Sequence, residues 1–66
     1  MCLSDVYINN RNEGNLLMRN IADIKIEGNI LVMTDIMGIP RQLKATVKKV
    51  DLIDNYIIVD MERDPA

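Results

Sequence analysis

Short runs of alternating apolar and polar residues, separated by tight turn signals, constrain the fold of this 66-residue chain more than any other feature. The alternation is clear over residues 2–9 and 22–27, and β-branched residues are frequent over residues 56–61. Gly28-Asn29 and Asp54-Asn55 are typical of short hairpin turns. This spacing predicts an all-β fold, a small antiparallel barrel of five to six short strands, because closure hides the edges of a small sheet.

Three details of this pattern can be tested against a structure. Over residues 16–27 the apolar positions change phase, which predicts a bulge or bend near Asn20-Ile21. In the return strand after the first hairpin, both faces are apolar, and we assign Ile30, Val32 and Ile36 to the core and Leu31, Met33 and Met37 to the opposite face. Residues 45–47 are expected to form a bend or a 3₁₀ turn between strands at 41–44 and 48–53.

The length predicts a single domain over residues 1–66, of a size that is marginally stable on its own. Such domains commonly need a disulfide, a metal or self-association, and one cysteine cannot form an internal disulfide. A strand with two apolar faces must be covered twice, which favours a homodimer. The alternative is that Met33 and Met37 fill an irregular core.

Composition argues against several classes of function. The chain has no histidine, no glycine-rich phosphate loop and no cluster of acids, so we do not expect an enzyme. The net charge of −2 gives no general attraction to nucleic acid or anionic lipid. Apolar runs are too short to span a membrane, and an unpaired cysteine fits a reducing compartment, so we expect a cytoplasmic protein.

One basic run is the only feature that favours nucleic acid. It contains Arg41, Lys44, Lys48 and Lys49, with no acidic residue between Asp35 and Asp51. Binding of single strands also needs aromatic platforms, and the chain has only two tyrosines. We therefore expect a solvated face and consider nucleic-acid binding unlikely, while a small RNA-binding β-barrel protein stays open as the alternative function.

Cys2, the only cysteine, is the candidate metal ligand. A buried, purely structural thiol is the alternative. Next to the chain terminus, however, a thiol and a nitrogen can both lose protons to a competing cation. One terminus supplies too few donors, whereas two copies would supply two thiolates and two nitrogens. A four-coordinate set of nitrogen and sulfur suits nickel(II) or copper(II) better than zinc.

The opening Met1-Cys2-Leu3-Ser4 with Val6-Tyr7, the segment from Ile24 to Glu27-Gly28-Asn29, and Val50-Asp51-Leu52 together resemble the CooT family over nearly the whole chain. The resemblance implies an SH3-like β-barrel homodimer and a nickel(II)-binding, metallochaperone-like accessory protein for carbon monoxide dehydrogenase maturation. It also implies that Cys2 is the nickel ligand, with one nickel held between two copies. The expected partner is carbon monoxide dehydrogenase or its nickel-insertion machinery.

Overall fold

The structure, a computed structural model, describes residues 3–61 of the chain. Five β-strands follow one another, with one turn of 3₁₀ helix between the first two. The elements are β1 (Ser4–Ile8), η1 (Glu13–Asn15), β2 (Leu16–Glu27), β3 (Ile30–Asp35), β4 (Pro40–Asp51) and β5 (Tyr56–Met61). Both predicted hairpin turns join neighbouring strands.

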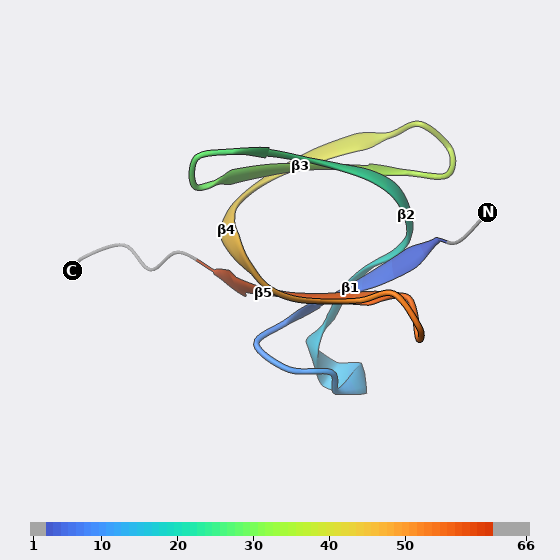
Figure 1. Cartoon of the computed structure of the whole chain (residues 1–66). Helices are drawn as coiled ribbons and strands as arrows, with labels where there is room; N and C mark the ends of the chain where they lie inside the picture. The colour runs from blue at the N-terminus through green and yellow to red at the C-terminus, as the bar shows by residue number, and fades with distance from the viewer. Residues whose placement is uncertain (1–2, 62–66) are drawn as a thin grey trace.

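The strands form a closed barrel in the order β1-β2-β3-β4-β5, so that β1 returns to β5 (Figure 1). Four of the pairings are antiparallel. The closing pair is parallel, with Val6 opposite Ile57. The prediction of a small all-β barrel of five to six short strands is confirmed. No turn connects the first strand to the last, which is why local patterns did not reveal this parallel pair.

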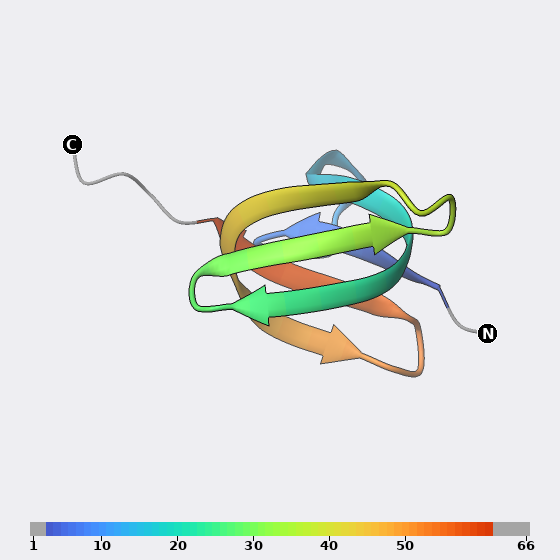
Figure 2. The same ribbon diagram turned by 90° about the horizontal axis from the view of Figure 1, so that it is seen from above.

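The two long strands, β2 and β4, bend and so contribute to both halves of the barrel (Figures 1 and 2). In β2, Asn20 has a φ of 57° and the pairing register shifts on both sides of Ile21, so the predicted bulge is confirmed. The expected break at residues 45–47 is wrong. β4 is continuous there, and an irregularity between Val47 and Lys49 takes up the bend.

The barrel interior is filled by aliphatic and methionine side chains. Its buried cluster consists of Val6, Met18, Ile21, Leu31, Met33, Ala45, Ile57 and Val59. Leu31 is 0% exposed and Met33 is 1% exposed. Ile30 and Val32, which we had assigned to the core, are only half-buried. The predicted inward face of β3 was therefore wrong, and Leu31 and Met33 do not offer a second apolar face to another copy.

The pairing partners of β3 explain why Leu31 and Met33 face the barrel interior. Residues directly opposite each other on two antiparallel strands point to the same face. Met33 lies opposite Ile24, and Leu31 lies opposite Ile26. Both alternating sets of β3 are apolar, so the strand itself could not identify its inner face; the neighbouring strand does, because there Ile24 and Ile26 alternate with charged residues.

Candidate functional site: the start of β1 and the open side of the barrel

Cys2, the predicted metal ligand, lies outside the described residues. The first described strand begins two positions later at Ser4, opposite Ile21. The amide of Asp5 donates a hydrogen bond of 3.1 Å to the carbonyl of Asn55, and the amide of Asn20 donates one of 3.3 Å to the Asp5 carboxylate. These bonds attach the start of β1 to the β4–β5 turn and to the bend of β2.

Next to Ser4, the barrel has an open side. β1 pairs with β2 only as far as Ile21, and β3 pairs with β4 only between Pro40 and Lys44. Within the described part of the chain, residues 22–27 of β2 and 46–51 of β4 therefore have a strand along one edge only. In an antiparallel pair, alternate backbone groups point away from the partner strand. Each open edge consequently presents amide and carbonyl groups that no strand within residues 3–61 pairs with.

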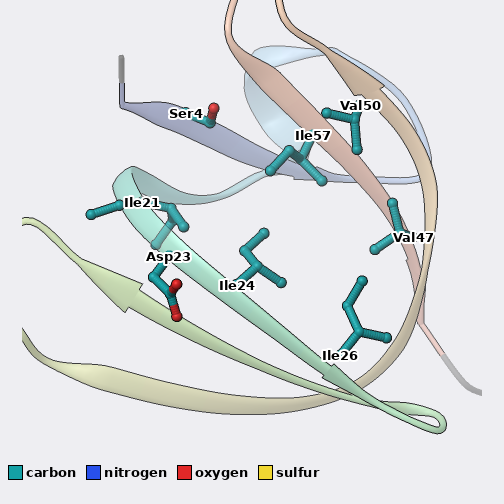
Figure 3. Close-up of a pocket in the computed structure, with 9 residues that line it drawn as sticks. Ser4, Ile21, Asp23, Ile24, Ile26, Val47, Val50 and Ile57 are labelled. Carbon is teal, nitrogen blue, oxygen red and sulfur yellow. The ribbon is translucent and has the colours of Figure 1, made fainter. Parts of the chain in front are cut away.

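Between these two edges lies a groove of about 240 Å³. Figure 3 shows side chains from β2 facing side chains from β4 and β5 across it. The lining residues are Ser4, Ile21, Ala22, Asp23, Ile24, Ile26, Val47, Val50 and Ile57. Ile26 is 64% exposed and Val50 is 51% exposed. Ile26 lies opposite the core residue Leu31, and Val50 lies opposite the core residue Ile57. The groove is therefore a part of the barrel interior that none of the described strands covers.

The sequence analysis missed this groove, although it assigned Ile24 and Ile26 to the inner face of their strand. A signal was available in the strand lengths. β1 has five residues and β2 has twelve, so a short first strand cannot pair with the whole of the second. The uncovered length of β2 is the half that carries Ile24 and Ile26.

The four residues of the basic run are all exposed, as predicted for a solvated face. These side chains have different surroundings and do not form one continuous basic surface. Lys48 Nζ donates to the carbonyl of Asn9 at 3.3 Å, and Lys49 Nζ donates to the hydroxyl of Tyr56 at 2.9 Å. Arg41 lies near a small pocket on the other half of the barrel. Two of the four cations are thus attached to neighbouring groups of the barrel.

The two tyrosines form a cluster with basic side chains. The rings of Tyr7 and Tyr56 meet edge to face, with centroids 6.2 Å apart. The guanidinium of Arg11 lies 4.2 Å from the centroid of the Tyr56 ring. The hydrogen bond to the Tyr56 hydroxyl raises the pKa of Lys49. Because Arg11 covers the ring and Tyr56 is only 8% exposed, this ring is a poor platform for stacking a base.

The described residues offer few alternatives to Cys2 as a metal ligand. Within residues 3–61, no three acidic, cysteine or histidine side chains gather where they could hold an ion. The same part of the chain contains no helix long and apolar enough to cross a membrane.

Comparison with known proteins identifies a family and a solved structure of similar fold. The family model for "CO dehydrogenase accessory protein CooT" matches residues 1–60. A crystal structure of a protein assigned as CooT from Carboxydothermus hydrogenoformans aligns with 94% of this chain and 100% of that chain, with a TM-score of 0.80 and 22% sequence identity. At this identity the structural likeness shows the fold alone. No curated protein matches the sequence.

Proposed function

This chain belongs to the CooT family of CO dehydrogenase accessory proteins, and from that membership we propose that it binds nickel(II) through Cys2 for maturation of CO dehydrogenase. One nickel ion is held between two copies and is the cargo of the protein. The match to the family model carries this proposal, because it includes residues 1 and 2 and so covers the candidate ligand.

The chemistry of the chain supports the choice of ligand. Cys2 is the only cysteine and there is no histidine, so one residue supplies all the soft or borderline side-chain donors except thioethers. Two thiolates and two nearby nitrogens from two copies make a four-coordinate set that nickel(II) accepts. A single copy has half of these donors, so the complete site requires association.

A titration of nickel into the unaltered chain and into Cys2→Ser tests the proposal. The unaltered chain should bind one ion per two copies, release protons on binding and bind more tightly as the pH rises, because the donors must lose protons. Cys2→Ser should lose this binding, because a hydroxyl is a harder and far less acidic donor. Ser4→Ala is the matched control and should bind as the unaltered chain does. Equal nickel affinity and stoichiometry in Cys2→Ser would refute the proposal.

The proposed recipient is CO dehydrogenase or its nickel-insertion machinery. Family membership supports this partner through the accessory role, and a pull-down of that machinery that depends on nickel and on Cys2 would test it. The alternative, a small RNA-binding barrel, has less support from the geometry. Its basic residues lie on different parts of the surface, and the Tyr56 ring is covered by Arg11.

A further inference from the structure

Asp5 connects the start of β1 to two parts of the chain that are distant in sequence. Its amide donates to the carbonyl of Asn55 at 3.1 Å, and its carboxylate accepts a hydrogen bond of 3.3 Å from the amide of Asn20. Asn55 lies in the turn before β5, and Asn20 lies in the bend of β2. Asp5 is also where the described pairing of β1 with β5 begins, opposite Tyr56. The position of this strand start therefore depends on contacts of Asp5 with both sides of the barrel.

Both hydrogen-bond partners of Asp5 have a left-handed backbone. The φ angle is 57° at Asn20 and 59° at Asn55. This conformation is uncommon for residues other than glycine, and the surrounding structure must hold it in place. At Asn20 a second contact does so, because its carbonyl accepts a hydrogen bond of 3.0 Å from the amide of Ile36. Unusual backbone angles of this kind concentrate at functional sites, and here two of them meet at one residue.

The carboxylate of Asp5 is placed to receive the Asn20 amide rather than to pair with a cation. Asp5 is half-buried, and within residues 3–61 it forms no ion pair. The next residue, Val6, is 0% exposed and belongs to the core, so the strand is fixed on the inner side directly after Asp5. Loss of the Asp5 carboxylate would therefore release the strand start from the bend of β2 while the core contacts of β1 remain.

We propose that Asp5 is a positioning residue for the nickel site, because it holds the start of β1 in the place from which Cys2 offers its donors. This inference rests on the proposed function, in which Cys2 is the ligand. Cys2 precedes Asp5 by three residues, and three residues of extended chain span at most about 11 Å. A change in the position of Asp5 is thus passed on to the ligand over a very short length of chain.

The expected consequence is a higher affinity for the metal. When donors lie near a chain end, the apparent affinity falls in proportion to the fraction of time that the end spends outside its binding position. The hydrogen bonds of Asp5 raise the fraction of chains in which the strand start is held. Its negative charge would also attract a cation, so the two effects of the carboxylate, as hydrogen-bond acceptor and as charge, must be separated by experiment.

Nickel titration of three variants makes this separation. Asp5→Ala should raise the dissociation constant for nickel about three- to tenfold, the effect expected from the loss of one hydrogen bond. Asp5→Asn should stay within about twofold of the unaltered chain, because its amide oxygen can still accept from Asn20 although the charge is gone. Asp23→Ala is the matched control and should have no effect, since it removes an exposed carboxylate from the groove that Ser4 also lines.

Hydrogen exchange of the metal-free protein, followed by NMR, tests the same role without nickel. In Asp5→Ala the amides of residues 5 and 20 should exchange at least about threefold faster than in the unaltered chain, because the start of β1 opens more often. Asp5→Asn and Asp23→Ala should leave both rates nearly unchanged. Circular dichroism checks that each variant is folded at the temperature of the titration.

The outcomes distinguish this inference from the proposed function. Equal nickel affinity in Asp5→Ala and the unaltered chain would overturn the positioning role, while nickel binding that is lost in Cys2→Ser would leave the proposed function standing. Equal weakening in Asp5→Ala and Asp5→Asn would assign the effect to charge and would also overturn the positioning role, as would weaker binding with unchanged exchange rates. An unaltered chain that binds no nickel would overturn both proposals.

Discussion

β5 and the second half of β2 are both rich in apolar residues, but the barrel covers only one of them. Residues 56–59 of β5 are buried one after another, and none is more than 9% exposed. In β2, Ile26 points to the inner face and is still 64% exposed. Residues 22–27 also carry three charged side chains, but the inward Ile26 is as apolar as the isoleucines of β5 and differs from them in its neighbours. Burial of such a side chain in a small barrel therefore depends on which edges and faces are covered.

β5 is covered on both edges and on its outer face. It pairs with β1 on one edge and with β4 on the other. The loop between β1 and β2 lies against its outer side (Figure 1), where the amide of Asn9 donates to the carbonyl of Val59 at 2.9 Å and Arg11 lies over Tyr56. The second half of β2 has β3 on one edge and nothing described on the other.

The comparison predicts that truncating an apolar side chain in β5 has the largest effect. Ile58→Ala should lower the free energy of unfolding by about 2–4 kcal/mol, because it removes buried methylene groups and leaves a cavity. Urea or guanidinium unfolding followed by circular dichroism measures this loss.

Ile26→Ala makes the same change in the open segment and is the matched control. Measured at a concentration where the chain is monomeric, it should change the free energy of unfolding by less than about 0.5 kcal/mol, because the side chain is already mostly in water. The concentration matters, since association stabilises the folded state by mass action. Similar losses for Ile58→Ala and Ile26→Ala would show that the two segments are equally covered in the monomer.

The features of the fold that depend on local patterns could be predicted from the sequence. The turns at Gly28-Asn29 and Asp54-Asn55, the bulge at Asn20-Ile21 and the boundaries of β5 follow from residue preferences and alternation within a few positions. The special conformations fall on residues that accept them: Gly28 has a φ of 60° and Asn55 a φ of 59°.

The open side of the barrel depends on contacts between distant segments, whereas the inner face of β3 depends on its partner in the hairpin. Leu31 and Met33 are assigned to the core by the register around Gly28-Asn29, which places them opposite Ile26 and Ile24. The groove exists because β1 ends its pairing at Ile21, which no pattern within β2 reveals. The candidate metal ligand, in contrast, could be predicted without knowledge of the fold. Cys2 could be named because it is the only cysteine and lies beside the terminus, and its role stays a prediction.

A smaller effect is expected from the loop that covers β5. Arg11→Ala should lower the free energy of unfolding by about 0.5–1 kcal/mol, mainly by removing the cation from the face of the Tyr56 ring. The ion pair of Arg11 with Asp54, 3.6 Å long and half exposed, adds little. Arg41→Ala, at an exposed position of β4, is the control. If thermal unfolding shows equal losses for both, the contact with Tyr56 does not contribute to the cover of β5.

The smallest effect concerns the turn that leads into β5, where Asp51 acts as a local cap. Its carboxylate accepts hydrogen bonds from the amides of Asp54 at 2.8 Å and Ile53 at 2.9 Å, and these bonds lower the pKa of Asp51 below its ordinary value of 3.8. A carboxyl group whose pKa is lower in the folded state stabilises the protein above its unfolded pKa and loses that contribution as the pH falls through the folded pKa.

Asp51 should therefore stabilise the fold fully at neutral pH and lose this contribution only below about pH 4. Carboxyl NMR titration should give Asp51 a lower pKa than the unfolded chain, and Asp51→Asn should make unfolding less dependent on pH in that acidic range. Glu27→Gln, at the exposed end of the open β2 segment, is the matched control because it also replaces one carboxylate by an amide. An ordinary pKa for Asp51 would mean that the two amide hydrogen bonds do not favour its charged form, and that the turn into β5 is held by backbone pairing alone.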